Sequence, residues 1–207
     1  MTMTWGIAAA ASYFLGAIPT SYLVARAARG LDLRMVGSGN LGATNLYRML
    51  GWKYAFPVAL FDACKGAIPV AVFGPWIHAG MVGSLVLGFI AVIGHVFSVF
   101  VRFRGGKGVA TSAGVVFGLA PAAFAAALAI WGATLALSGY VSLASIIAAA
   151  ILPAAIWFLD PMRRGLAGWF AALAVLVIWM HRGNIRRLLN GTENRFGRAE
   201  PLARGTQ

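Results

Sequence analysis

The fold is decided by residues 76–108, WIHAGMVGSLVLGFIAVIGHVFSVFVRFRGGKG, where an apolar run is followed at once by a basic, glycine-rich segment. The apolar part, Trp76–Val101, is long enough to cross a bilayer, which takes about 20 residues. The part that follows combines Arg and Lys with three glycines, so it belongs at the membrane surface. The rest of the chain alternates between these two kinds of segment.

The composition predicts a polytopic membrane protein with a single membrane domain, residues 1–207. Hydrophobic residues make up 60% of the chain and charged residues 11%, which is too few for a water-soluble surface. The net charge of +12 indicates anionic lipid or anionic substrates, because the hydropathy argues against a nucleic-acid partner. Of the 17 cationic residues 14 are Arg, whose planar guanidinium suits phosphate binding.

Further apolar runs predict the other membrane-spanning helices. The runs are Met3–Ala25, Trp52–Phe73, Trp76–Val101, Gly139–Leu159 and the shorter Leu166–Met180. The run Val109–Leu137 is too long for one ordinary span, and Gly118 and Pro121 interrupt it. It forms either one tilted helix or a hairpin of two short helices.

The distribution of Lys and Arg predicts the orientation. Segment Arg26–Lys53 holds five cations, Arg102–Lys107 three and the tail after Met180 six. The positive-inside rule places all three groups in the cytoplasm, which requires two spans in Val109–Leu137. We therefore expect an all-α protein with seven transmembrane helices, the N-terminus outside and the C-terminus cytoplasmic. Only the two arginines of the Asp160–Gly165 loop then break the rule.

Three polar segments, residues 34–53, 94–112 and 181–196, combine Gly, Asn, Ser or Thr with fixed positive charge, which is the chemistry of anion binding. In the first segment, glycines let backbone N–H groups approach an anion. A helix beginning near Leu41 would point its N-terminus at that anion and carry Thr44 and Arg48 on one face. A glycine-rich turn with an interfacial arginine is the alternative interpretation.

The second and third segments repeat this chemistry. The run Gly105-Gly106-Lys107-Gly108 is typical of a phosphate-binding nest before a helix, although a basic cap on the preceding span would also explain it. In the third segment His181, Asn184 and Arg187 are spaced to share one helical face. His181 is a candidate general base near neutral pH, and an interfacial histidine in a basic tail is the alternative.

Asp62 and Lys65 place opposite charges at i and i+3 inside an apolar run. Charges within a span are costly, so they are usually paired or functional. We expect a structural ion pair, with a direct catalytic role for Asp62 as the alternative. The scattered His and acidic residues predict no metal site.

Several motifs together resemble a known family and cover nearly the whole chain. They are Gly37-Ser38-Gly39-Asn40-Leu41-Gly42-Ala43-Thr44-Asn45, Asp62-x-x-Lys65-Gly66, Gly94-His95 through Arg104-Gly105-Gly106-Lys107-Gly108-Val109-Ala110-Thr111, and His181-x-x-Asn184-Ile185 with Gly191 and Glu193. This set resembles the bacterial acylphosphate:glycerol-3-phosphate acyltransferases. The resemblance implies transfer of a fatty acyl group from acyl phosphate to the 1-hydroxyl of glycerol 3-phosphate, giving lysophosphatidic acid and phosphate for phospholipid synthesis.

The resemblance also implies a location, partners and site residues. It implies the bacterial inner (plasma) membrane with a cytoplasmic active site, no cofactor, and as partners both substrates, the bilayer and an enzyme that supplies acyl phosphate. By analogy, glycerol 3-phosphate is assigned to Ser38, Arg48, Lys107 and His181. Acyl phosphate is assigned to Thr44, Gly105, Gly106, Lys107, Gly108, Ser145 and Asn184. Catalytic roles are expected for His181, Asn184, Lys107 and Asn40.

Two points stay open from the sequence. The proton acceptor is either His181 or a substrate phosphate, whose second pKa is near 6. The function could also be transport of an organic phosphate anion or another lipid-phosphate transfer, but transport predicts sites near mid-membrane, whereas these polar groups gather at one face. An H-x-x-x-x-D box is absent, which argues against an acyl-CoA-dependent enzyme of that type.

Overall fold

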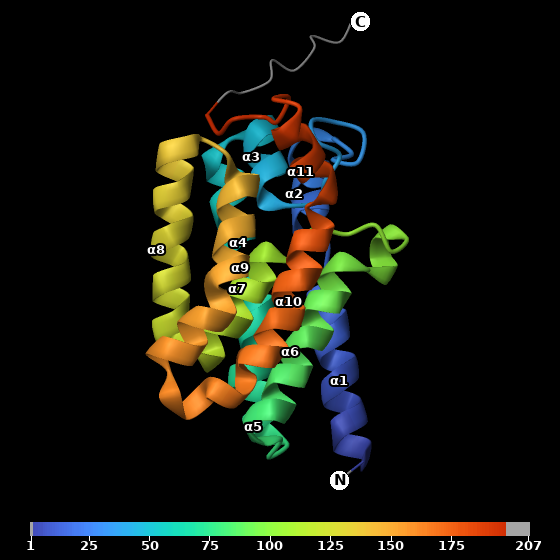
Figure 1. The fold of residues 1–207 in the computed structure, drawn as a ribbon. Coiled ribbons are helices and arrows are strands. Elements are labelled where there is room, and N and C mark those ends of the chain that lie inside the picture. Colours follow the sequence, from blue (N-terminus) through green and yellow to red (C-terminus); the bar gives the residue numbers. More distant parts are fainter. Residues whose placement is uncertain (1, 198–207) are drawn as a thin grey trace, which may run out of the picture.

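The computed structural model describes residues 2–197 as a bundle of helices (Figure 1). The ends of the expected domain, residue 1 and residues 198–207, lie outside the described residues. The α-helices are α1 (Thr2–Ala17), α2 (Thr20–Arg29), α3 (Ala43–Leu50), α4 (Trp52–Ile68), α5 (Gly74–Trp76), α6 (Gly80–Val96), α7 (Val109–Leu119), α8 (Pro121–Ser138), α9 (Val141–Leu159), α10 (Ala167–Met180) and α11 (Arg182–Leu189). A π-helical turn, Pro69–Phe73, joins α4 to α5, and 3-10 turns cover Val99–Val101 and Pro161–Leu166.

Six helical stretches in the described part of the chain are long and apolar enough to cross a membrane. They are Thr2–Arg29, Trp52–Trp76, Gly80–Val101, Pro121–Ser138, Val141–Leu159 and Pro161–Met180. The seventh, α7, is apolar but shorter. The run that the sequence left open is therefore two helices, which meet at Ala120 (φ −142°, ψ 70°), because a residue before proline avoids the helical region.

The first expected span, Met3–Ala25, is not one continuous helix. It breaks between α1 and α2, because Pro19 has no N–H to donate and its ring clashes with a preceding carbonyl. At the break, the carbonyl of Ile18 accepts hydrogen bonds from the Thr20 N–H at 2.9 Å and from Lys65 Nζ at 2.8 Å. The break between α1 and α2 therefore provides a backbone carbonyl that binds the buried Lys65 ammonium of α4.

Glycines bring two pairs of helices into backbone contact. A Cβ placed on Gly66 of α4 would lie 1.9 Å from a carbonyl oxygen of α7, and one on Gly114 of α7 would lie 1.9 Å from a carbonyl of α4. Gly16 of α1 and Gly94 of α6 approach each other's helix in the same way, at 2.0 and 2.3 Å. Such small residues are what lets membrane helices pack closely, since lipid gives no hydrophobic drive for helix association.

The polar segments meet at one end of the bundle. Figure 1 shows α2, α3 and α11 together at the end opposite the start of α1. The second polar segment runs from the C-terminal end of α6 to the start of α7. Segments far apart in sequence can therefore contribute to one site.

Candidate active site

A cavity of about 470 Å³ lies among all three polar segments. Its polar lining includes Ser38, Asn40, Thr44, Arg48, Asp62, His95, Lys107, Gly108, Ser145, His181, Asn184 and Glu193. Most of the residues expected from the sequence are thus brought together, but Gly105, Gly106 and Lys65 are not part of the lining. No group of three His, Cys, Asp or Glu side chains that could hold a metal ion occurs within residues 2–197.

A chain of hydrogen bonds fixes the cationic centre of the cavity. Lys107 Nζ donates to Asn184 Oδ1, and Asn184 Nδ2 donates to Glu193 Oε1 at 2.7 Å. Lys107 has three N–H donors, and this contact uses one of them. The ammonium group is therefore held in place while retaining donors for a ligand.

Glu193 organises this end of the site, although its role did not emerge from the sequence. Its carboxylate accepts hydrogen bonds from Ser142 at 3.0 Å, Asn184 at 2.7 Å and Arg187 at 2.7 Å. Burial raises the pKa of this carboxyl, but the hydrogen bonds from these three side chains outweigh burial and hold the pKa below its usual value. The feature of the sequence that could have indicated this role is that Glu193 is an acidic residue within a basic tail.

Asn194 and Phe196, which follow Glu193, connect the C-terminal segment to two other parts of the site. The carbonyl of Asn194 accepts a hydrogen bond from the Arg48 guanidinium at 3.3 Å. The Phe196 N–H donates to the Gly139 carbonyl at 2.7 Å, and its ring stacks on Tyr47 with centroids 4.8 Å apart. The segment after α11 is thus tied to both α3 and the α8–α9 turn.

The Lys107 ammonium is half-buried, and this changes its acidity. Burial lowers the pKa of Lys107 to about 8, with Glu193 opposing this shift and Arg187 and Arg48 adding to it. Lys107 is therefore mostly protonated at neutral pH, and its charge is lost as the pH rises through about 8.

His181 is held as a neutral imidazole. Its Nδ1 lies 2.8 Å from the Val177 carbonyl, which can only accept, so Nδ1 carries the proton and Nε2 has the lone pair. Burial lowers the pKa of His181 to about 4, and the nearby charge of Lys107 contributes to this shift. His181 is in the protonation state of a base, but it is a weak one.

Asn45 shapes the first polar segment. Its Oδ1 accepts from the Ser38 N–H at 3.0 Å, and its Nδ2 donates to the carbonyls of Leu33 at 3.2 Å and Val36 at 3.1 Å. Gly37 adopts φ +57°, and a Cβ there would lie 2.3 Å from Asn45 Oδ1. Gly37 therefore lets the loop wrap around Asn45, which fixes Ser38 at the cavity.

The glycines of the second segment have a different role from the one expected. The N–H groups of Gly105 and Gly106 donate to the carbonyls of Val96 at 3.0 Å and His95 at 3.2 Å, so they are not available to an anion. A Cβ on Gly105 would lie 1.9 Å from the His95 carbonyl oxygen. Their small size allows close packing against the end of α6, and the expected nest is reduced to Lys107, Gly108 and the first turn of α7.

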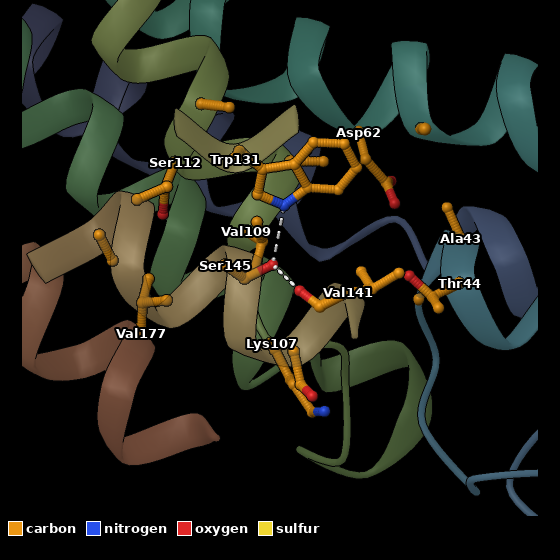
Figure 2. A pocket seen from close by; sticks show the side chains of 18 of the residues that line it. Ala43, Thr44, Asp62, Lys107, Val109, Ser112, Trp131, Val141, Ser145 and Val177 are labelled. Carbon is orange, nitrogen blue, oxygen red and sulfur yellow. Dashed lines mark hydrogen bonds between the residues drawn. The ribbon is translucent and has the colours of Figure 1, made fainter. Parts of the chain in front are cut away.

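Ser145 also differs from the expectation that it binds a phosphate. Its hydroxyl donates to the Val141 carbonyl at 2.9 Å and accepts from Trp131 Nε1 at 3.2 Å (Figure 2). Since the hydroxyl proton is already used, Ser145 has no donor for a phosphate oxygen. It forms part of the cavity wall and fixes the indole of α8.

Away from the polar end, the cavity becomes apolar. Its lining there comes from α4, α7, α8, α9 and α10 and includes Phe56, Ala59, Val116, Phe124, Leu128, Trp131, Leu152 and Leu173. One end of the cavity thus suits phosphate groups, and the other suits a hydrocarbon chain.

The ion pair expected between Asp62 and Lys65 is present, at 2.6 Å. Both side chains are buried. Asp62 also lines the cavity, whereas Lys65 does not.

Comparison with known proteins gives one consistent family. The family model described as glycerol-3-phosphate acyltransferase matches residues 6–191. Proteins named glycerol-3-phosphate acyltransferase from Geobacter sulfurreducens and Geotalea daltonii are 45% and 46% identical to this chain. The first alignment covers 92% of this chain and 96% of that protein, and the second covers 90% and 95%.

Solved structures give the same answer. A crystal structure of PlsY (YgiH), described as an integral membrane glycerol 3-phosphate acyltransferase in its glycerol 3-phosphate form, matches with a TM-score of 0.84 and 37% identity over 93% of this chain and 96% of that one. The lysophosphatidic acid form of PlsY matches with a TM-score of 0.82 and 35% identity, over 93% of this chain and 95% of that one.

Proposed function

The chain belongs to the glycerol-3-phosphate acyltransferase family, and from this premise we propose that its acyl donor is an acyl phosphate, bound beside glycerol 3-phosphate in the cavity. The protein acylates glycerol 3-phosphate in phospholipid synthesis. The observation that carries the proposal is the position of Lys107. It lines the same cavity as the apolar residues of α4 and α7–α10, and it keeps unused donors.

Glycerol 3-phosphate binds at the polar end. Its phosphate contacts Ser38, Arg48 and Lys107, whose hydroxyl, guanidinium and ammonium groups all donate to phosphate oxygens. His181 contacts it through Nε2, which accepts a hydrogen bond from a glycerol hydroxyl. The three polar segments that meet in this cavity support the assignment.

Acyl phosphate binds between that position and the apolar lining. Its phosphate lies against Lys107, Gly108 and the N-terminus of α7, with Thr44 of α3 in the same lining. Gly108 has φ +79°, which lets the chain turn into α7, and Val109 and Ala110 at the start of α7 line the cavity. The acyl chain follows the apolar lining between α4 and α8–α10.

The chemistry requires positioning and charge stabilisation, because the mixed anhydride is already activated. The 1-hydroxyl oxygen of glycerol 3-phosphate forms a bond to the carbonyl carbon, and the bond from that carbon to the phosphate oxygen breaks. Asn184 has one N–H left after its bond to Glu193, and either this N–H or the amide of Asn40 donates to the developing oxyanion.

The proton of the 1-hydroxyl passes to a substrate phosphate. A phosphate with a second pKa near 6 is a stronger base than His181, whose pKa is lowered by burial to about 4. His181 then positions glycerol 3-phosphate. The difference in basicity supports the substrate as the proton acceptor.

The first test is an assay of the purified protein. Glycerol 3-phosphate is supplied with acyl phosphate or with acyl-CoA, and both lysophosphatidic acid and free phosphate are measured. We expect equal amounts of both products from acyl phosphate. Absence of lysophosphatidic acid with that donor would overturn the donor assignment.

The proposed setting is the bacterial inner membrane, with seven spans, α7 among them, and with the site facing the cytoplasm. Six long apolar helical stretches and the shorter α7 support this count. In a Cys64→Ala background, Ala122→Cys beside the α7–α8 break should react with an impermeant maleimide added to intact cells. Leu189→Cys should react only after permeabilisation, and the reverse pattern would overturn the topology.

A further inference from the structure

We propose that His95 is a substrate-binding residue whose Nε2–H donates to a phosphate oxygen of the bound acyl phosphate. This inference rests on the function proposed above. His95 lies at the end of α6, is 9% exposed and lines the cavity with Lys107 and Gly108.

Lys65 determines which nitrogen of His95 carries the proton. Lys65 Nζ lies 3.4 Å from His95 Nδ1. A proton on Nδ1 would point at the positive charge of the ammonium group, which has no acceptor, so the proton of the neutral ring is placed on Nε2. Lys65 is held in this position by Asp62 at 2.6 Å and by the Ile18 carbonyl at 2.8 Å, so its charge stays beside Nδ1.

The Nε2 edge of the ring faces the turn that leads to Lys107. A Cβ placed on Gly106 would lie only 2.3 Å from His95 Nε2, so this residue must be Gly for the ring to adopt its position. The Gly106 N–H in turn donates to the His95 carbonyl at 3.2 Å. The imidazole is thus held at a fixed place beside the phosphate-binding part of the second segment.

This donor lacks an acceptor from the protein. Among residues 2–197, the structure gives His95 one side-chain hydrogen bond, at Nδ1, and none at Nε2. Within the same residues, the buried side-chain atoms that lack a partner are on Ser21, Thr111 and Ser112, and His95 Nε2 is not one of them, so this atom is accessible from the cavity. The acceptor for its N–H can therefore come from the cavity contents, and a phosphate oxygen is the acceptor that this substrate offers.

The position of the ring favours acyl phosphate over glycerol 3-phosphate. Lys107 is assigned to the phosphates of both substrates, but Gly108 and the start of α7 are assigned to acyl phosphate alone, and the ring lies against Gly106, two residues before Gly108. Ser38 and His181, which hold glycerol 3-phosphate, belong to the first and third segments. Both substrates offer a phosphate oxygen to His95. Measuring KM for acyl phosphate and KM for glycerol 3-phosphate separately shows which of the two phosphates it binds.

Two amide variants separate substrate binding from a purely structural role. In His95→Asn, the side-chain oxygen can take the place of Nδ1 and accept from Lys65, but the ε donor is lost. In His95→Gln, the amide N–H reaches the position of Nε2, while the acceptor for Lys65 is lost. His95→Asn therefore keeps only the acceptor for Lys65, and His95→Gln keeps only the donor at the position of Nε2.

We expect His95→Asn to raise KM for acyl phosphate roughly 10- to 100-fold and to leave KM for glycerol 3-phosphate within about twofold, as expected for a lost hydrogen bond to a charged group. His95→Gln should retain most of the acyl phosphate affinity. A normal His95→Asn with an impaired His95→Gln would show that the ring serves only Lys65. A rise confined to glycerol 3-phosphate would also overturn the inference.

A second measurement avoids variants that fold poorly. In wild-type protein with ¹⁵N-labelled histidine, an acyl phosphonate should shift the Nε2 resonance of His95, and glycerol 3-phosphate alone should not. Absence of a shift at saturating acyl phosphonate overturns the inference. A wild-type protein that makes no product from acyl phosphate would instead defeat the proposed function, so the two failures are distinguishable.

Discussion

Lys65 and Lys107 are two lysines close to the same cavity, and their surroundings differ in one decisive respect. Lys65 Nζ is within hydrogen-bonding distance of four acceptor atoms, on Ile18, Thr20, Asp62 and His95. Lys107 Nζ has a single protein partner among the described residues, Asn184. A lysine with three donors is therefore saturated at the first position and left with unused donors at the second.

A structural lysine and a ligand-binding lysine differ in how many of their donors the protein uses. Burial alone does not separate them, since both lysines are at least partly removed from solvent. The number of unused donors does separate them. Lys65 holds α4 against the α1–α2 break and α6, whereas Lys107 is positioned by one bond and keeps donors for a ligand.

The largest effect should follow from Lys65→Met, which leaves Asp62 buried without its counter-ion. Breaking one partner of a buried pair costs about 3–5 kcal/mol, so we expect a large loss of stability in thermal unfolding in detergent. The double variant Asp62→Leu with Lys65→Met should recover most of the loss, because it removes both charges. Wild-type-like unfolding of Lys65→Met would show that the pair is not structural.

Lys107→Met should affect the reaction instead of the fold. We expect kcat/KM to fall about 10²- to 10³-fold, as for loss of a donor to developing or phosphate charge, with the unfolding temperature close to wild type. The matched control is Lys53→Met, because Lys53 is exposed and does not line the cavity. Full activity in Lys107→Met would contradict the phosphate-binding role.

The activity should depend on pH through Lys107. Burial lowers the pKa of Lys107 to about 8, so the ammonium that binds phosphate is present below that pH and lost above it. We expect kcat/KM to fall about tenfold per pH unit above pH 8. Lys107→Arg should abolish this fall even if its activity is lower, because guanidinium does not titrate in this range.

The smallest effect should come from His181→Ala. Under the proposal that a substrate phosphate takes the proton, we expect a loss of about tenfold or less, mainly as a higher KM for glycerol 3-phosphate. If the turnover rate instead fell by about 100-fold or more, His181 would be identified as the base. His78→Ala is the matched control, since His78 does not line the cavity and follows α5 at the other end of the bundle (Figure 1).

Much of the fold could be predicted from hydropathy and charge. The apolar runs locate the long helices, and Pro121 marks the boundary between α7 and α8. Hydropathy does not predict the break at Pro19, because the apolar run continues through this residue. The only local feature that marks the break is the proline itself. The meeting of three basic segments at one end followed from the distribution of Lys and Arg.

The site could be predicted only as a set of residue types. Lys107, Asn184 and Ser38 could be singled out because cationic and polar groups are rare in this chain. The organising roles of Glu193 and Asn45 depend on contacts between distant segments, which local patterns do not contain. The same is true of the glycines before Lys107, whose N–H groups are bound to the end of α6.

The hydrogen bond between Arg48 and Asn194 joins residues 146 positions apart in sequence. Together with Glu193, it means that the cavity is completed by nearly the last part of the described chain. A nascent chain that has inserted most of its helices still lacks the carboxylate that orients Asn184 and Lys107. The residues that complete the lining of the cavity are therefore among the last of the described chain to be synthesised.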